Sequence, residues 1–333
     1  MTAFIPKYLR FLTFLMVFVC VQPIVAGRPK VGLVLGGGGA KGAAEVGVLK
    51  VIEEAGIPID YVAGTSIGAI VGGLYATGYT AAELDSIFRQ QDWIPLLTDR
   101  REDLMQVPYR EIDGIVYLFG FPVYDINRES HGRIGALKGN RVETLIDSLM
   151  GVRGMNEFSL LKRPFSCVAC DLRTGSEVIL DDGIPAQAMR ASMAIPGVFK
   201  PVRRDSLLLL DGGMANNLPV DLVRRMGADI VIAIDLQQNE VEVHKKRDLS
   251  LLHLVADPLG IGGLVRWAGE RPDIDKYLDN RQHCDLYLHP RLDGYDVTSF
   301  GTASVAHMLQ LGEEEGRCHW DDLLRLKALI DNE

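Results

Sequence analysis

The chain has 333 residues, of which 47% are hydrophobic, and its formal net charge is −9 at pH 7. This length accommodates one large α/β domain or two smaller ones, and the apolar content is sufficient for a packed core. The acidic balance excludes the basic surface typical of nucleic-acid-binding proteins, so we expect no nucleic-acid partner.

Residues 1–26 have the pattern of a secretory signal peptide. Lys7 and Arg10 precede the apolar run 11–21, Pro23 interrupts this run, and Ala26 offers a small residue for cleavage. The run is short for a membrane span, which favours cleavage, although the sequence alone leaves a retained anchor open. We therefore expect an exported protein whose mature chain begins near residue 27.

The stretch 31–54 predicts a buried strand, a glycine loop and a helix. Residues 31–35 form a short apolar run, four glycines follow at 36–39, and the apolar positions of 43–54 have helical spacing. Backbone N–H groups of such a loop can approach a negative group at the positive end of a helix. The loop therefore predicts a site for a phosphate or for a transient oxyanion.

A second predicted strand, 57–63, runs directly into Gly64-Thr65-Ser66-Ile67-Gly68, and a helix of small residues follows. A GxSxG motif between a strand and a helix has the form of a nucleophile elbow, a sharp turn that exposes the serine hydroxyl. The motif alone occurs often by chance, but this context predicts Ser66 as a nucleophile. Thr80 and Glu83 then predict a capping box at the start of the next helix.

The remaining chain continues to alternate strands and helices. We expect a hairpin of 115–119 with 123–126, and then helix 141–150, strands 164–172 and 177–180, helix 184–194, strand 207–210, helix 219–226 and strand 229–236. The rest is expected to be mainly helical, including 249–255, 261–268, 303–317 and 321–330, with a short strand at 286–288. Strands alternating with helices predict an α/β fold with a parallel sheet covered on both sides.

The cysteines do not point to a metal or redox site. Cys167 and Cys170 have CxxC spacing, but both fall in a predicted strand, where residues three apart face opposite sides. We expect packed core cysteines, and no second CxxC is present to complete a zinc site. The states of Cys284 and Cys318 remain open at this point.

A serine nucleophile requires a base, and the sequence offers two kinds. Asp211 ends an apolar strand before Gly212 and Gly213, which places its carboxylate at the edge of the sheet where ligands bind. No histidine follows a strand in a comparable setting; the candidates are His131, His244, His253, His283, His289, His307 and His319. We therefore favour a Ser66–Asp211 dyad.

The glycine loop then has a function in the predicted reaction. Attack of a serine on an ester creates an oxyanion, and backbone donors of Gly37, Gly38 and Gly39 are placed to hold it. Lys41 either adds positive potential or lies on the surface. We expect no metal and no organic cofactor.

Three motifs in this order and spacing resemble those of the patatin-like phospholipases: Gly37-x-Gly39-x-x-Gly42, Gly64-x-Ser66-x-Gly68 and Asp211-Gly212-Gly213. Shorter matches support the resemblance: Asp171-Leu172-x-Thr174-Gly175, Ala191-Ser192-x-Ala194-Ile195-Pro196 and Asn216-Asn217-x-Pro219. The resemblance runs from about residue 29 to residue 236. It is strongest to the exported bacterial members and to the branch that resembles neuropathy target esterase.

This resemblance implies a three-layer α/β/α sandwich with a mainly parallel central sheet. After the signal peptide that the composition of 1–26 predicts, it implies a phospholipase domain at 29–236, and we expect a mainly helical extension at 237–333 that packs on the same domain. It also implies hydrolysis of phospholipid or other acyl-ester substrates at a membrane surface, through Ser66, Asp211 and the glycine-loop oxyanion hole. The implied location is periplasmic or secreted, in a bacterium.

Three alternatives remain open. Gly37-x-Gly39-x-x-Gly42 followed by Asp60 is compatible with a dinucleotide-binding oxidoreductase, although Asp60 begins its strand where a ribose-binding acid should end it. A Ser-His-Asp hydrolase would use one of the histidines. A non-catalytic lipid-binding protein could keep the same fold.

Overall fold

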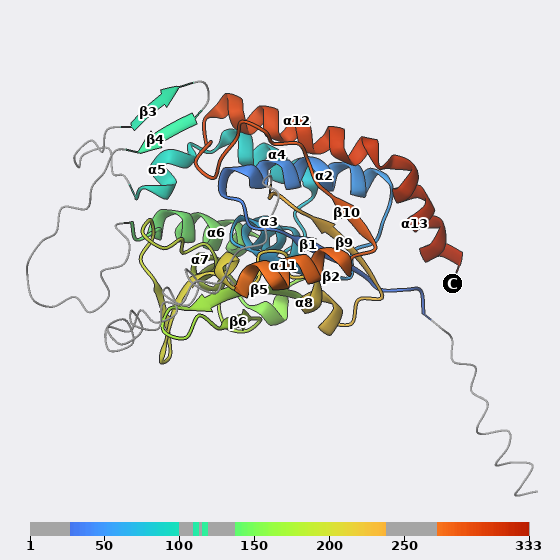
Figure 1. Cartoon of the computed structure of the whole chain (residues 1–333), viewed down its shortest axis with the longest axis horizontal. Helices are drawn as coiled ribbons and strands as arrows, with labels where there is room; N and C mark the ends of the chain where they lie inside the picture. Colours follow the sequence, from blue (N-terminus) through green and yellow to red (C-terminus); the bar gives the residue numbers. More distant parts are fainter. Residues whose placement is uncertain (1–26, 100–108, 113–114, 119–136, 238–271, 333) are drawn as a thin grey trace, which may run out of the picture.

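The structure is a computed structural model that describes residues 27–99, 109–112, 115–118, 137–237 and 272–332 (Figure 1). The predicted signal peptide at 1–26, the predicted strand 123–126 and the predicted helices 249–255 and 261–268 lie outside the described residues.

The described residues form an eight-stranded sheet with the order β10-β9-β1-β2-β5-β8-β7, and β6 also pairs with β5. The strands are β1 (Val31–Leu35), β2 (Tyr61–Thr65), β5 (Phe165–Asp171), β6 (Glu177–Leu180), β7 (Val202–Arg204), β8 (Leu207–Asp211), β9 (Ile230–Ile234) and β10 (Leu286–Leu288). The five strands from β10 to β5 run parallel, whereas β6, β8 and β7 pair antiparallel at the other end.

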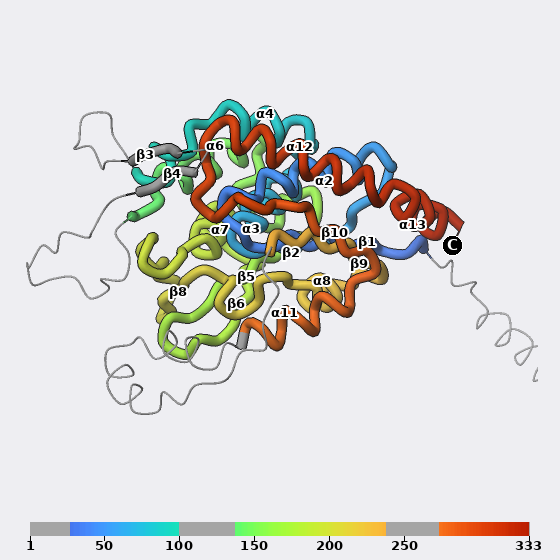
Figure 2. The backbone as a smooth tube through the Cα atoms, turned by 45° about the horizontal axis from the view of Figure 1, so that its top comes forward, coloured from blue at the N-terminus to red at the C-terminus, as the bar shows by residue number. Residues whose placement is uncertain are grey.

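Helices cover both faces of this sheet, as Figures 1 and 2 show. They are α2 (Gly42–Glu54), α3 (Ile67–Ala76), α4 (Ala81–Gln90), α5 (Trp93–Leu97), α6 (Asn140–Val152), α7 (Pro185–Ser192), α8 (Val220–Arg225), α11 (Pro272–Gln282), α12 (Thr302–Cys318) and α13 (Trp320–Asn332). Alternate residues of β9 separate the two faces: Ile230, Ile232 and Ile234 join the larger core with α2 and α3, and Val231 and Ala233 join the smaller core with α8. The predicted three-layer α/β/α sandwich is confirmed.

The C-terminal helices pack on this sandwich. Helix α12 lies along α2, and α4 packs beside it, on the upper side in Figure 1. The predicted capping box of α4 is present, because Thr80 accepts from the Glu83 amide and Glu83 accepts from the Thr80 amide. Within the described ranges, no helix combines the length and apolar character needed to cross a bilayer.

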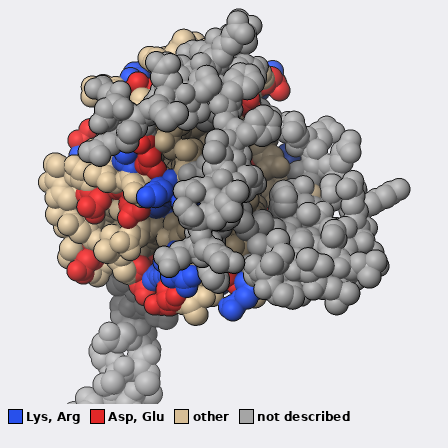
Figure 3. All heavy atoms as spheres, turned by 90° about the vertical axis from the view of Figure 1, so that its left-hand side faces the viewer, with Lys and Arg blue, Asp and Glu red and all other residues tan. Residues whose placement is uncertain are grey.

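Two local predictions concern the hairpin near residue 115 and the two cysteines of β5. Strand β4 (Ile115–Leu118) pairs antiparallel with β3 (Tyr109–Ile112), so 115–118 forms a hairpin with the segment before it. The partner that the sequence predicted, 123–126, lies outside the described residues, so that pairing stays a prediction. Cys167 and Cys170 are buried in different cores on opposite faces of β5, as the strand spacing predicted. On the face shown in Figure 3, the visible described basic and acidic side chains are interspersed rather than separated by sign.

Candidate active site

Ser66 occupies the tight turn between β2 and α3. Its φ is +57° and its ψ is −121°, a strained conformation for a residue with a side chain. The turn closes only because its flanking residues lack side chains: a Cβ on Gly64 would lie 2.3 Å from the Gly68 carbonyl oxygen, and one on Gly68 would lie 2.3 Å from that of Leu35. The sequence therefore builds a nucleophile elbow here, with Ser66 at the carboxyl end of a parallel strand.

Asp211 reaches this serine from a distant part of the chain. It ends β8, and its Oδ2 accepts a hydrogen bond of 2.6 Å from the Ser66 hydroxyl. Its other oxygen, Oδ1, accepts one of 2.8 Å from the Gly213 amide, which orients the carboxylate toward the serine. Ser66 is 5% exposed and Asp211 is 7% exposed, so the pair lies in a site with little water.

The environment of Asp211 makes its carboxylate a better base. Burial raises its pKa to about 6, and the hydrogen bonds from Ser66 and Gly213 oppose this shift because they stabilise the charged form. A carboxyl group with this pKa is still ionised near neutral pH but binds a proton more readily than an exposed aspartate.

The glycine loop lies against the serine, but its three predicted donors are not equivalent. The Gly37 amide already donates to the Asn217 carbonyl at 3.1 Å. Among the described residues, the amides of Gly38 and Gly39 have no hydrogen-bond partner. Gly39 has a φ of +59°, and a Cβ there would lie 2.4 Å from the Val297 carbonyl oxygen. Two amides, rather than the predicted three, are thus available to an oxyanion.

Ser192 contributes to the elbow, although the sequence assigned it no role. Its hydroxyl accepts a hydrogen bond of 2.9 Å from the Ser66 amide and donates one of 2.6 Å to the Val168 carbonyl of β5. Ser192 is fully buried at the end of α7. It therefore ties the strained turn to the sheet, and it occupies the Ser66 amide, which cannot then bind substrate. Its place in the Ala191-Ser192 motif was the only sequence signal for this contact.

The remaining predicted site residues support the loops. The ammonium group of Lys41 donates to the Leu236 carbonyl at 2.7 Å, and burial lowers its pKa while Asp235 and Asp296 oppose that shift. Lys41 therefore fastens the glycine loop to the end of β9. Gly42 begins α2 against Ile67, and Gly212 packs on the Val168 carbonyl.

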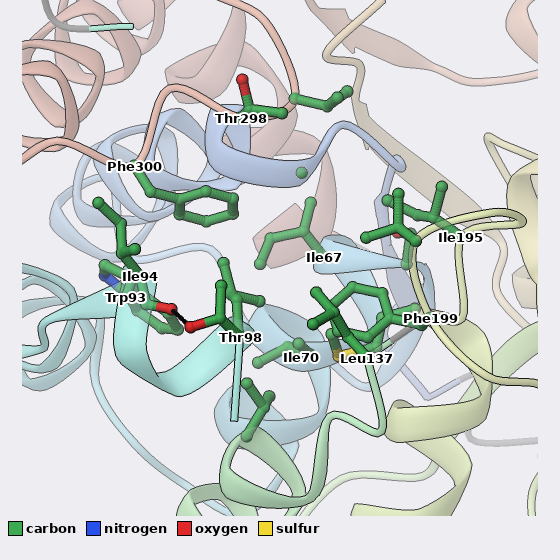
Figure 4. A pocket seen from close by; sticks show the side chains of 17 residues that line it. Ile67, Ile70, Trp93, Ile94, Thr98, Leu137, Ile195, Phe199, Thr298 and Phe300 are labelled. Carbon is green, nitrogen blue, oxygen red and sulfur yellow. Dashed lines mark hydrogen bonds between the residues drawn. The ribbon is translucent and has the colours of Figure 1, made fainter. Parts of the chain in front are cut away.

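Two hollows meet at the serine. The first is an apolar cavity of about 120 Å³ (Figure 4), lined by Gly39, Ser66, Ile67, Ile70, Trp93, Ile94, Leu97, Thr98, Leu137, Val142, Met193, Ile195, Val198, Phe199, Val297, Thr298 and Phe300. The second is a groove of about 640 Å³ with a mixed lining, whose polar residues include Asp211, Lys41, Asn217, Asp273 and Asp296. We call it the polar groove because the charged residues that line the two hollows all belong to it. Both hollows share Gly39, Ser66, Ile195 and Val297, so the serine stands between an apolar and a polar compartment.

None of the histidines that the structure describes hydrogen-bonds Ser66, and none lines either hollow. His289 contacts the Gln237 carbonyl, His307 the Tyr295 hydroxyl, and His283 the Asp279 carbonyl. His319 lies beside Glu315 and Asp322. The other three candidates, His131, His244 and His253, lie outside the described residues.

The dinucleotide alternative does not fit the geometry. Asp60 accepts hydrogen bonds from the side chain of Arg28 and from the amide of Val31, at the start of β1. The glycine loop follows the other end of that strand. A ribose held by Asp60 would therefore lie at the opposite edge of the sheet from a phosphate at the loop. Within the described residues, no cluster of three or more His, Cys, Asp and Glu could hold a metal ion.

The family profile described as patatin-like phospholipase matches residues 33–224, more than half of the chain. The chain belongs to the patatin-like phospholipase family. The matched region contains the elbow, the glycine loop and the Asp211 turn, so the sequence resemblance is confirmed. The branch resembling neuropathy target esterase is confirmed as well, by the relatives described next.

Patatin-like phospholipase domain-containing protein 6 of Homo sapiens is 34% identical over 287 residues, covering 81% of this chain and 19% of that protein. Lysophospholipase nte1 of Aspergillus niger is 32% identical over 315 residues, covering 90% of this chain and 18% of that protein. The chain thus spans about a fifth of the length of these relatives. The solved structure of VipD from Legionella pneumophila has the same fold, with a TM-score of 0.56 and 13% identity over 89% of this chain and 67% of that chain.

The predicted location was wrong. The relatives that support the family assignment are eukaryotic proteins, from human, mouse, Drosophila melanogaster and Aspergillus niger, rather than exported bacterial ones. The expectation of a periplasmic or secreted bacterial protein rested on an apolar run beside Lys7 and Arg10. Such a composition is shared by many apolar N-terminal segments, so it does not identify an exported protein by itself.

Proposed function

We propose that this protein is a serine-dependent lipid acyl hydrolase in which Ser66 is the nucleophile and Asp211 the general base. The observation that carries this proposal is the 2.6 Å hydrogen bond from the Ser66 hydroxyl to the Asp211 carboxylate, at the junction of an apolar and a polar hollow. A serine hydroxyl is a weak nucleophile until a base within hydrogen-bond reach removes its proton.

The reaction proceeds through an acyl-enzyme. Asp211 takes the Ser66 proton as Oγ attacks the ester carbonyl, and the resulting oxyanion is held by the amides of Gly38 and Gly39. The tetrahedral intermediate collapses, the alcohol leaves with the proton from Asp211, and the acyl group stays on Ser66. Water then gives a proton to Asp211 as its oxygen attacks the acyl carbonyl. When this second intermediate collapses, Asp211 returns the proton to the Ser66 Oγ, which frees the fatty acid and restores both residues. Loss of a single oxyanion donor typically costs about 3 kcal/mol of transition-state stabilisation.

The two hollows hold the parts of the substrate on either side of its ester bond. The apolar cavity takes the acyl chain, and the polar groove takes the alcohol portion with its head group. The family name and the name of the Aspergillus niger relative, a lysophospholipase, support a lipid ester as substrate. We place the reaction at a membrane surface, which the protein meets peripherally to collect substrate. No metal or organic cofactor enters this scheme.

Incubation of the purified protein with a phospholipid, a lysophospholipid and a simple ester tests this function, with the products identified by mass spectrometry. We expect release of free fatty acid from at least one of the lipids. A protein that binds these lipids but releases no fatty acid would instead be the non-catalytic lipid-binding alternative.

The pH dependence of kcat/KM reports the ionisation of the general base, which we propose to be Asp211. Since Asp211 accepts a proton only as a carboxylate and its pKa is raised to about 6, activity is expected to fall below that pH and to level off above it. One ionisation gives a loss of about tenfold per pH unit on the acid limb. This limb should persist when each histidine is replaced in turn; its disappearance in one histidine variant would contradict the assignment.

A further inference from the structure

The apolar cavity beside Ser66 is lined at one end by aromatic side chains. In Figure 4, Trp93 and Ile94 of α5 and Phe300 lie on one side, Ile195 lies on the other, and Ile67 and Ile70 lie between them. Ile195 also lines the polar groove, so its side of the cavity is the one next to the reacting ester. Trp93 therefore lies at the end away from the groove.

The tryptophan is held firmly in this position. It is 4% exposed, and its ring centroid lies 4.9 Å from that of Phe88 and 6.2 Å from that of Phe300. Its indole Nε1 donates a hydrogen bond of 3.0 Å to the Phe88 carbonyl. Phe88 is not among the lining residues of the cavity, so its ring supports the indole without contributing to the wall.

Beyond Ser66, the described wall of the cavity is almost entirely apolar. Thr98 and Thr298 are its other hydroxyl-bearing lining residues, and both donate locally, to the Ile94 carbonyl at 2.8 Å and to Asp296 at 2.7 Å. With the indole N–H also paired, no side-chain N–H or O–H donor among the described residues of the wall is left for a ligand. An unbranched apolar chain fits such a wall, whereas a polar chain would lose its hydrogen bonds to water.

We propose that Trp93 limits the length of the acyl chain that this protein accepts, with Ile70 setting the width of the path to it. This inference rests on the proposed function, because it assigns the apolar cavity to the acyl side of the ester. A chain too long to end at the indole must bend or leave methylenes in water. In a hydrophobic pocket, one methylene too many changes kcat/KM by about tenfold or more.

The test compares kcat/KM for p-nitrophenyl butyrate, octanoate, dodecanoate and palmitate. In Trp93→Ala, the lost ring lengthens the cavity, so the ratio of the longer to the shorter esters should rise by about tenfold or more. In Ile70→Phe, the added ring enters existing cavity space, so the same ratio should fall. This second variant keeps the test decisive if Trp93→Ala does not fold. Unchanged ratios in the folded variants would overturn the inference.

Controls separate this inference from the function on which it rests. Trp320→Ala removes an indole of α13 that does not line the cavity, and it should leave the chain-length ratios as in the wild type. If the wild type hydrolyses no ester, or if Ser66→Ala hydrolyses all of them, the proposed function fails and the inference falls with it. If hydrolysis depends on Ser66 but the ratios do not change in either variant, only the inference fails.

Discussion

Replacing Ser66 with alanine is expected to lower kcat for ester hydrolysis by about a million-fold, the loss typical when a serine hydrolase loses its nucleophile. No other side chain is placed to take over the attack, because within the described ranges the only hydrogen bond to the Asp211 Oδ2 comes from the Ser66 hydroxyl. The melting temperature should change little, since the alanine keeps the backbone of the elbow and removes one hydrogen bond. Steady-state kinetics and a thermal unfolding curve measure both effects.

The matched control is Ser159→Ala, the same change at an exposed serine outside the site, which should leave turnover unaltered. Turnover that survives in Ser66→Ala, in protein shown by mass to carry the substitution, would remove Ser66 as the nucleophile.

Asp211→Asn is expected to lower kcat by about 10²- to 10⁴-fold, the range that a general base contributes. The asparagine has nearly the same shape and can still accept the Gly213 amide, but its amide group cannot take the Ser66 proton. The fold should therefore remain while the reaction slows, and the acid limb of the pH profile should disappear with the carboxyl group. Steady-state kinetics across a pH series measures both changes.

An exposed aspartate provides the comparison for this change. Asp182→Asn alters a carboxylate whose side chain is 78% exposed and should leave kcat unchanged. The Ser-His-Asp alternative predicts the reverse pattern, in which one histidine variant loses turnover and Asp211→Asn keeps it.

Sequence patterns were sufficient to predict several of the strands that position the site residues. The apolar runs at 31–35, 57–63 and 229–236 identified the strands β1, β2 and β9, and glycines marked the turns that follow two of them. They did not show that β8 pairs antiparallel with β5, because an apolar run has the same composition in either direction. That pairing brings Asp211 within hydrogen-bond distance of Ser66, although the two residues are 145 positions apart in the sequence. The sequence indicated this contact only through the motifs that contain the two residues.

Other features of the site depend on contacts that no local pattern encodes. The Gly37 amide is occupied because Asn217 lies beside it, although the sequence offers three equivalent glycines. Ser192 supports the elbow from α7, and Trp93 lines the apolar cavity from α5, and each is an ordinary residue in its own segment. Cavity walls assembled from separate segments can be recognised only after the chain is folded.

The most direct test of the Ser66–Asp211 pair is the rate at which a fluorophosphonate probe labels the protein, followed by peptide mapping of the adduct. We predict that the wild type is labelled on Ser66 and that Asp211→Asn, correctly folded, is labelled far more slowly on the same residue. Equal labelling rates for the two proteins, or an adduct on a residue other than Ser66, would contradict the proposal that the Asp211 carboxylate activates this serine.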